Sequence, residues 1–586
     1  MKKRHWKVLL LLSILLFGSN WSYAEKNVLN RKYDSTSFVK VDHLFDEHVK
    51  SGFHPYKVTI RNGYERPLTW TIRFDTNASN YRYQTSHQIR VEAGAEAVEE
   101  LIIPAPPTKG HRYSNYRNVR VSATAPGLEN EYPRSISGSV DPNWPAIVMS
   151  KNLARRNLSR LSSVRKEQKR GQDYFASSFN ELPSNWKGLT CVDILMIDDA
   201  SWRALPKQQK RAAMTWVRYG GRLEVFAAKQ DATFEDVGFE EPDFVKEKKG
   251  TFSLGTVTIN HWNGKDLPDQ LVNRYAGSRQ FDNSFNQDFS KSWGLLDDFG
   301  TKNFNPFLVF ILLVIFAVLV GPINLFHFAK AGQRHRLFIT TPIISLVASL
   351  VIIFIILVQD GMGGNGRRVV FVDVQSDPEQ RQLQLLQHQV SRTGVMLRSG
   401  FDNEATPGVI PVNLPPSRWN PINNGQFRNS NYQFNQGSYS GDFFRSRSEQ
   451  GFHLRAVRPT RSRIERRGPE GGGEVPNLFS SMEFAVTNFF YIDLNGIVWK
   501  TAKEAPVEPG QEIQLEKSDI IELTEWLNDV TNVMAEADQR QIRNLKSSRQ
   551  RYFAIAKTPT PLMIDTHSAI RWKQDFAIVS GMTVEP

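Results

Sequence analysis

Two long apolar runs stand out in the pattern of hydrophobic and polar positions along this chain. Neither Pro306–Phe328 nor Leu337–Val358 contains an Asp, Glu, Lys or Arg residue. A helix of about 20 apolar residues crosses the hydrocarbon layer of a membrane, and it satisfies its own backbone hydrogen bonds there. The pattern therefore predicts two transmembrane helices, over 305–328 and 337–358.

The charges around these runs predict how the chain crosses the membrane. The short loop 329–336 contains Lys330, Arg334 and Arg336 and no acidic residue, so the positive-inside rule places it in the cytoplasm. Residues 1–24 combine a basic start, a short apolar core and small residues before the expected cleavage point, as a signal peptide does. Both features predict a two-pass protein of the cytoplasmic (inner) membrane, with both large flanking regions on the extracytoplasmic, periplasmic side.

The region 25–139 has the period of two that is typical of half-buried strands. Apolar and polar residues alternate in Thr69–Phe74 and Gln88–Val91, and turn signals such as Asn62-Gly63 separate runs of this kind. Several short strands with regular turns predict an immunoglobulin-like β-sandwich.

Between 140 and 300 the pattern changes to apolar strands that alternate with helices. Val192–Ile197 has the composition of a buried strand, Pro206 suits the start of a helix that Gly220-Gly221 ends, and Leu223–Phe226 is the next strand. Strand–helix–strand units with short connections favour a parallel, right-handed arrangement. We therefore expect a flavodoxin-like α/β domain over 140–300.

Over 359–586 the pattern of apolar and polar residues predicts an extracytoplasmic β-rich domain with one prominent helix. In that helix Ile520, Leu523 and Leu527 recur at helical spacing. The segment 415–475 is rich first in Asn, Gln, Ser and Gly and then in Arg, which predicts a basic low-complexity insert.

The Arg residues of this insert have two open interpretations. They suit contact with anionic lipid head groups, envelope polymers or an acidic protein face, or they belong to a solvated linker. A net charge of +13 over 586 residues would also suit nucleic acid, but the signal peptide, the cytoplasmic loop and this insert hold much of it, so no nucleic-acid partner is expected. The candidate residues for an anionic partner are Arg455, Arg458, Arg461, Arg463, Arg466 and Arg467.

Few residues are candidates for chemistry. The single cysteine, Cys191, excludes an intrachain disulfide and a multi-cysteine metal site. Asp198 and Asp199 follow a predicted strand, and open α/β sheets bind ligands at the carboxyl ends of their strands. These two residues are candidate ligand-binding residues, although the favoured interpretation is that they cap the following turn. No catalytic residue, cofactor or metal site is predicted.

Three segments carry a resemblance to a known family: WKGLTCVDILMIDDASWRALPKQQKRAAMTWVRYGGRLEVFA, VGPINLFHFAKAGQRHRLFITTPIISLVASL and FAVTNFFYIDLNGIVWKTAKEAPVEPGQEIQL. They resemble bacterial membrane proteins with an extracytoplasmic class I glutamine amidotransferase-like domain, of the kind encoded beside MoxR-type ATPases. True class I amidotransferases carry a Cys nucleophile on a sharp strand-to-helix turn. Cys191 instead precedes its strand, so the resemblance implies an amidotransferase-like domain without the nucleophile elbow.

These patterns together predict a non-catalytic binding or scaffold component of an envelope assembly, which the resemblance links to a MoxR-type ATPase system. Two alternatives stay open: an extracytoplasmic hydrolase or transferase that uses Asp198 or Asp199, and a lipid- or polymer-binding protein that acts through the Arg cluster 445–467. The expected partners are membrane lipid and envelope proteins.

Overall fold

The architecture comes from a computed structural model, which is mixed α/β with many sheets and two apolar helices. It describes residues 27–586 except 46–50, 79–80, 107–115, 129–132, 140–144, 168–175, 278–292, 298, 300–305, 329–331, 333, 377–380, 413–429, 469–473 and 503–504. The predicted signal peptide 1–24, and parts of the predicted cytoplasmic loop and of the low-complexity insert, lie outside the described residues.

The N-terminal part consists of two sheets with a shared core. The first is four-stranded, in the order β1 (Asn27–Lys32), β2 (Phe38–His43), β3 (Gly52–Arg61) and β6 (Glu96–Ala105). The second contains β5 (Tyr81–Val91), β4 (Leu68–Ala78), β7 (Tyr116–Thr124) and β8 (Arg134–Ser139). Alternate residues of both sheets, among them Val58, Trp70 and Val121, are buried in one cluster. The alternation found in the sequence thus supplies the apolar layer between the sheets.

The second sheet is completed by strands from far along the chain. Strand β20 (Ser430–Asn435) pairs in parallel with β5, and β21 (Ser438–Gly441) and β18 (Phe401–Asp402) follow at that edge. The structure therefore differs from the expected low-complexity insert over 415–475. Aromatic residues spaced by two, Tyr432 and Phe434, are buried against Tyr83, and this contact orders a segment whose composition is otherwise typical of loops.

The α/β part is built on a seven-stranded sheet. Its parallel strands run in the order β10 (Ala176–Phe179), β9 (Ile147–Ser150), β11 (Ile194–Asp198), β12 (Arg222–Ala227) and β15 (Gly255–His261), and antiparallel β14 (Lys249–Phe252) and β13 (Phe244–Lys246) complete it. The helices are α2 (Lys151–Glu167), α3 (Asp199–Ala204), α4 (Lys207–Arg218), α5 (Phe234–Val237) and α6 (Asp269–Gly277), with the 3-10 turn η1 (Trp186–Leu189).

Successive residues of β11 face opposite sides of this sheet, and each side has its own core. Leu195 and Ile197 join Trp216 of α4 in one cluster, whereas Ile194 and Met196 join residues of α2 and α6 in another. Helices therefore cover both faces, as a continuous apolar strand requires.

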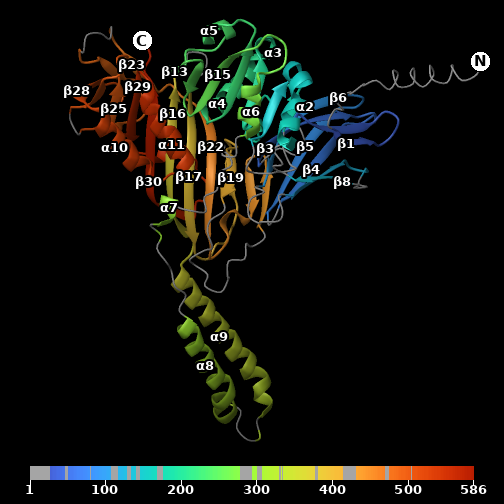
Figure 1. Ribbon diagram of the computed structural model, residues 1–586. Helices are drawn as coiled ribbons and strands as arrows, with labels where there is room; N and C mark the ends of the chain where they lie inside the picture. The colour runs from blue at the N-terminus through green and yellow to red at the C-terminus, as the bar shows by residue number, and fades with distance from the viewer. Residues whose placement is uncertain are drawn as a thin grey trace, which may run out of the picture.

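Two apolar helical segments form a hairpin that projects away from the strand-rich head (Figure 1). The first consists of α8 (Pro306–Val318) and the π-helical η2 (Leu319–Phe328), and the second of η3 (Arg334–Arg336) and α9 (Leu337–Asp360). In the most apolar stretches of Phe310–Phe328 and Arg334–Ile355, 6% and 0% of the residues are buried. The apolar side chains of the hairpin are therefore not packed inside the protein. The two helices are long and apolar enough to cross a membrane. A hydrogen bond of 2.9 Å from Asn324 Nδ2 to Thr341 Oγ1 joins them.

The C-terminal part is a nine-stranded sheet. Its order is β19 (Gly408–Val412), β22 (Glu449–Pro459), β17 (Gln382–Thr393), β16 (Gly364–Gln375), β30 (Ile570–Met582), β29 (Arg551–Ala556), β25 (Val486–Ile492), β26 (Val498–Thr501) and β28 (Leu515–Ser518). A small sheet contains β23 (Ile464–Arg466), β24 (Leu478–Ser480) and β27 (Glu512–Ile513). Short helical turns are α7 (Gly294–Asp297), η4 (Asp442–Phe444), η5 (Leu545–Ser547) and η6 (Thr560–Leu562).

The single helix expected in this part is two helices in the structure. Helix α10 (Ile520–Thr531) starts at an Asp519 cap and carries the predicted apolar stripe, but it ends before Met534. Helix α11 (Glu536–Asn544) follows, and Met534 is buried in the turn between them.

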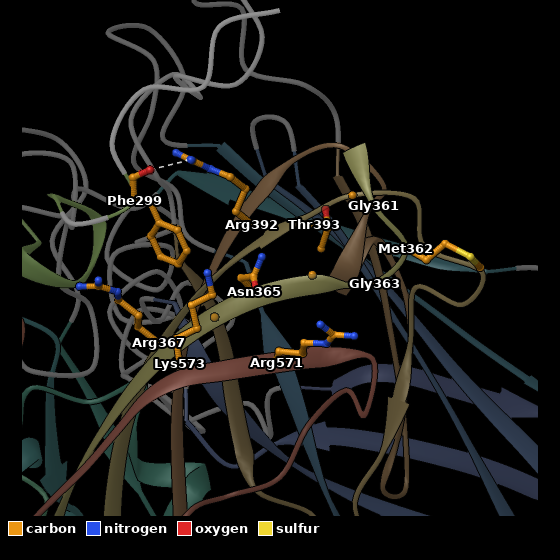
Figure 2. Close-up of a pocket in the computed structure, with 13 residues that line it drawn as sticks. Phe299, Gly361, Met362, Gly363, Asn365, Arg367, Arg392, Thr393, Arg571 and Lys573 are labelled. Carbon is orange, nitrogen blue, oxygen red and sulfur yellow. Dashed lines mark hydrogen bonds between the residues drawn. The ribbon is translucent and has the colours of Figure 1, made fainter. Parts of the chain in front are cut away.

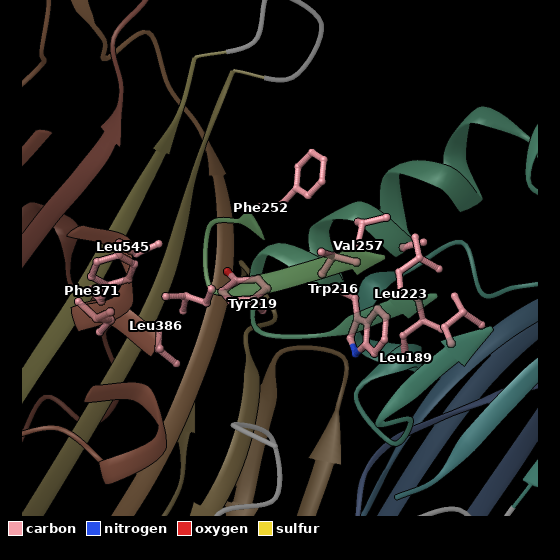
Figure 3. Packing of buried hydrophobic residues seen from close by; sticks show 14 of the residues in the cluster. Leu189, Trp216, Tyr219, Leu223, Phe252, Val257, Phe371, Leu386 and Leu545 are labelled. Carbon is pink, nitrogen blue, oxygen red and sulfur yellow. The ribbon is translucent and has the colours of Figure 1, made fainter. Parts of the chain in front are cut away.

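The parts of the head share contacts across their boundaries. One apolar cluster runs from Trp216 and Tyr219 of the α/β part to Phe371 and Leu386 of the C-terminal sheet (Figure 3). Within it, the Tyr219 hydroxyl donates to the carbonyl oxygen of Ala456 at 2.6 Å. On the other side, the Phe53 N–H donates to Thr190 Oγ1 at 2.9 Å. The head is therefore one continuously packed body above the hairpin.

Candidate functional site

Strand order in the α/β part identifies where a ligand would sit. Strand β10 follows β9 in the sequence and lies on one side of it in the sheet. The next strand, β11, lies on the other side of β9, and the later parallel strands β12 and β15 continue the sheet in that direction. Open α/β sheets bind ligands outside the carboxyl ends of the strands where the order reverses. Here those ends are Ser150 of β9 and Asp198 of β11.

The structure places Asp198 at this point, with both carboxylate oxygens engaged. Oδ2 accepts from Ser150 Oγ at 2.7 Å and from Ser201 Oγ at 2.6 Å, and Oδ1 accepts from the Ser201 N–H at 2.9 Å. Burial raises the pKa of Asp198, but the hydrogen bonds from Ser201, Ser150 and Asn152 outweigh it and lower the pKa below its ordinary value. Asp198 is therefore an ionised N-cap of α3.

Asp199 has a different environment from its neighbour. It is the first residue of α3, is half-buried, and has Oδ2 3.9 Å from Arg203 Nη2. The two candidate carboxylates are thus adjacent in sequence, and Asp198 is the one that contacts Ser150 at the carboxyl end of β9.

Cys191 is unsuited to act as a nucleophile. It is fully buried before β11, its Sγ lies 3.5 Å from the carbonyl oxygen of Gly188, and burial raises the pKa of the thiol far above its usual range. The thiolate is the reactive form, so a buried thiol with a raised pKa is inert near neutral pH.

Arg455, a candidate residue for an anionic partner, lies inside the fold. Arg455 is 2% exposed because β22 lies between β17 and β19 inside the sheet, and burial lowers its pKa to about 10 although Asp538 opposes this. Its guanidinium is therefore not on an open face of the protein, although Arg455 is among the residues that line the cleft described below. Strand alternation through Phe452, Leu454 and Ala456 was the signal that this stretch is a strand.

Most of the other predicted cluster residues already have partners within the chain. Arg458 donates to the carbonyl oxygens of Pro561 and Met563. Arg463 and Arg467 pair with Glu465, and Arg466 pairs with Glu585 at 2.8 Å. Arg461 is exposed, and no ion pair of Arg461 occurs among the described residues. Most of the cluster thus makes intramolecular contacts, and Arg461 is an exposed member for which the described residues show no ion pair.

A cleft of about 690 Å³ opens where the three parts of the head meet. Its walls come from β6, from η1 and α4, and from the C-terminal part, and its charged residues are Glu100, Lys187, Arg211, Arg381 and Arg455. Lys187 donates Nζ to the carbonyl oxygen of Thr406 at 3.0 Å, and burial lowers the pKa of Lys187 to about 8. Cations outnumber acids in the cleft, which favours an anionic or acidic ligand. Sequence reasoning missed this site because its residues come from segments hundreds of positions apart.

A buried group of two histidines and one aspartate lies between the C-terminal sheet and its helices. His388 Nε2 is 2.9 Å from Asp538 Oδ2, the rings of His388 and His453 stack with centroids 3.9 Å apart, and all three residues are buried. The Ala535 N–H donates to His388 Nδ1 at 3.2 Å, so a neutral His388 ring carries its proton on Nε2. That nitrogen then faces Asp538 with a proton and offers no lone pair to a metal ion. The group therefore suits a buried hydrogen-bonded contact.

This group predicts how stability depends on pH. Burial lowers the pKa of His388, against the effect of Asp538, and burial together with His388 and Arg455 lowers the pKa of His453 well below its usual value. Below about pH 6.5 the unfolded chain binds protons that the folded chain does not, so stability is lost as pH falls, by about 1.4 kcal/mol per pH unit for each such histidine. We expect a falling apparent Tm between pH 7.5 and pH 5.5, and a shallower fall for His453→Gln.

The control for this measurement is His261→Gln, because His261 is exposed. The control should keep the wild-type slope. A His453→Gln slope equal to that of the wild type would contradict the assignment of this proton uptake to the buried pair.

Comparisons with known proteins give no assignment. No family model matches the chain, and no curated protein matches it. Among solved structures, a calcium-binding mutant of Bacteroides uniformis beta-glucuronidase 2 is 8% identical over 33% of this chain and 24% of that chain, with a TM-score of 0.14. A Paenibacillus cycloisomaltooligosaccharide glucanotransferase is 8% identical over 71% of this chain and 70% of that chain, with a TM-score of 0.17. A beta-glucuronidase from glycoside hydrolase family 2 is 8% identical over 94% of this chain and 62% of that chain, with a TM-score of 0.19. Such low TM-scores assign neither a fold nor an activity here.

Proposed function

We propose that this chain is a two-pass protein of the cytoplasmic membrane whose extracytoplasmic head is a non-catalytic binding or scaffold component of an envelope assembly. The hairpin of α8 and α9 would anchor it, with Arg334 and Arg336 in the cytoplasmic turn. Strands and helices on both sides of the hairpin in sequence meet in one packed head, which suits a rigid platform better than two independent domains.

The non-catalytic assignment rests on which residue occupies the carboxyl end of β11. An amidotransferase-like domain would hold its nucleophile there, in the turn to the next helix. This chain has Asp198 in that place, with its oxygens occupied by Ser150 and Ser201, and its thiol is buried at the opposite end of the strand. The parallel order β10-β9-β11-β12-β15 is the flavodoxin-like order, and it supports the resemblance to amidotransferase-like membrane proteins of MoxR-associated systems.

The cleft between the three parts of the head is the surface that we propose for the envelope partner. Its excess of cations suits an acidic protein segment. Its walls belong to all three parts of the head, so a partner would bind there only when the three parts are assembled. Arg211 and Arg381 are exposed at its lining and reach it from different parts of the chain.

Affinity purification of the full chain after crosslinking in membranes tests this function. The wild type should recover a defined set of envelope proteins, and the variant Arg211→Glu with Arg381→Glu should recover them at least about fivefold less, because like charges across an interface suppress binding. The matched control is Lys246→Glu with Lys265→Glu, which reverses two exposed charges outside the cleft. Equal recovery by the cleft variant and the control, or recovery of nucleic acid in place of protein, would overturn the proposal.

A further inference from the structure

A second cavity, of about 500 Å³, lies at the base of the head where the chain leaves the apolar hairpin. It is lined by the run Gly361–Arg367, by Arg392 to Gly394 of the neighbouring strand, and by Phe299, Arg571 and Lys573. Figure 2 shows these basic side chains around the strand segment that carries Asn365. The cavity is separate from the cleft, because the two have no lining residue in common.

The lining of this basal pocket is cationic. Its described residues include Arg367, Arg392, Arg571 and Lys573, and none of these described lining residues is acidic. Arg571 and Lys573 are exposed, and within the described part of the chain neither forms an ion pair. Two neighbouring cations without an acid in their pocket repel each other, and an anion between them would relieve that repulsion.

Two of the cations are held in place by the fold. Arg392 Nη2 lies 2.5 Å from Glu449 Oε1, and its Nη1 donates to the carbonyl oxygen of Phe299 at 2.7 Å. The guanidinium groups of Arg392 and Arg367 lie 5.3 and 5.8 Å from the centre of the Phe299 ring. Burial lowers the pKa of Arg367. Glu449 thus holds Arg392 in place and offsets part of its charge, and a ligand would not need to order this wall of the pocket.

Another wall of the basal pocket contains the glycines Gly361, Gly363, Gly364 and Gly366, which have no side chain. A Cβ on Gly366 would lie 2.4 Å from the Trp572 ring, and one on Gly363, where φ is +82°, would lie 2.4 Å from the carbonyl oxygen of Ala569. Side chains are therefore excluded at these positions by close packing behind the pocket.

The pocket lies next to the level at which a membrane surface would be. Gly361 directly follows α9, and Phe299 precedes α8 by a few residues. A strand advances about 3.3 Å per residue, so Gly361–Arg367 reaches no more than about 25 Å beyond the end of α9. Met362 is 63% exposed at the pocket and Val358 is 69% exposed near the end of α9, so an exposed apolar side chain lies at each of these two positions.

We propose that the basal pocket binds the phosphate of an anionic phospholipid head group in the leaflet beside the head. Arg571 and Lys573 would contact the phosphate, Arg367 and Arg392 would supply the fixed positive wall, and Met362 would contact the acyl region. These cations attract an anionic lipid at a membrane surface. A zwitterionic lipid also carries a positive charge, which the same cations repel, so it should bind more weakly. The inference rests on the membrane insertion that the proposed function includes.

The test is lipid competition on the full chain in nanodiscs. The discs contain phosphatidylcholine alone or with phosphatidylglycerol, and retained phosphatidylglycerol is counted by native mass spectrometry after release from the disc. The wild type should retain phosphatidylglycerol over phosphatidylcholine, and Arg571→Gln with Lys573→Gln should reduce that preference about thirtyfold, because each of the two cations near the surface contributes about 1 kcal/mol. The matched control Lys246→Gln with Lys265→Gln should keep the wild-type preference.

Three other outcomes would overturn the proposal. The first is equal retention of the two lipids by the wild type, and the second is an unchanged preference in the pocket variant. The third is equal protection against thermal unfolding by inorganic phosphate and by short-chain phosphatidylglycerol, which would show a phosphate site without a role for the lipid. Resistance of the protein to alkaline carbonate extraction reports membrane insertion separately, so a failed head-group site is distinguishable from a failed membrane assignment.

Discussion

Arg551→Ala is expected to lower the free energy of unfolding of the head by about 3–5 kcal/mol, because it removes one partner of a buried ion-pair network. Arg551 is 1% exposed. Its Nη1 lies 3.1 Å from Asp373 Oδ1 on β16 and donates to Ser580 Oγ at 2.9 Å, and its Nη2 lies 2.5 Å from Asp243 Oδ2 in the α/β part. Without the guanidinium, two carboxylates remain in a largely buried place with no cation between them.

The measurement is thermal unfolding of the full chain in detergent, followed by circular dichroism. A loss of this size corresponds to a fall in apparent Tm of about 5–10 °C for a cooperative unit of a few hundred residues. Arg551→Met separates charge from packing, since it keeps most of the side-chain volume and should still lose most of the stability. The control Arg549→Ala removes an exposed arginine two positions away and should change stability by no more than about 0.5 kcal/mol. Equal Tm values for Arg551→Ala and the control would contradict a structural role for the network.

Trp216→Ala is expected to cost about 3–5 kcal/mol, because it leaves a large cavity between α4 and the sheet. The Trp216 ring is fully buried and lies beside Leu223 and Val257 (Figure 3). A Cβ on Gly221 would lie only 2.4 Å from this ring, so the chain at the end of α4 already approaches it as closely as glycine allows. The cavity would therefore have rigid backbone on one side and could not close easily.

A second substitution at the same position sharpens this test. The Trp216 indole N–H is buried and makes no hydrogen bond in the described part of the chain. Trp216→Phe keeps most of the ring and removes the unpaired N–H, so its cost should be less than about half that of Trp216→Ala. Chemical denaturation of both variants measures the difference, and equal losses would show that packing of the ring is not what stabilises this interface.

The two apolar helices were predictable because their sequences leave few alternatives. An uncharged run such as Leu337–Val358 is too long for an ordinary strand and too apolar for a surface helix. The structure places a helix over Leu337–Asp360, within two residues of the predicted end. The alternation of half-buried strands and the strand–helix order of the α/β part were visible for the same reason, since each is a local periodicity.

Features that depend on distant segments were not predictable in this way. The residues around Tyr432 do not indicate that this segment pairs with β5. The segment is rich in Asn and Gln, so it was expected to be a loop. Arg455 was grouped with the neighbouring arginines because arginine is seldom buried, whereas the folded chain buries it, and Asp538 from a distant segment partly opposes the effect of that burial on its pKa. The cleft and the basal pocket likewise require strands and turns that only tertiary structure brings together.

The pairing of β20 with β5 has a consequence for how a newly made chain matures. The hydrogen bond from the Ser86 N–H to Asn435 Oδ1 joins residues 349 positions apart, so at about 5–20 residues per second the partner of β5 emerges from the ribosome about 20–70 s later. During that interval the edge of β5 has unpaired backbone groups, which can recruit strands of other chains. The N-terminal half is thus made before its own sheet can close, and a chaperone that shields exposed strands would have its substrate here.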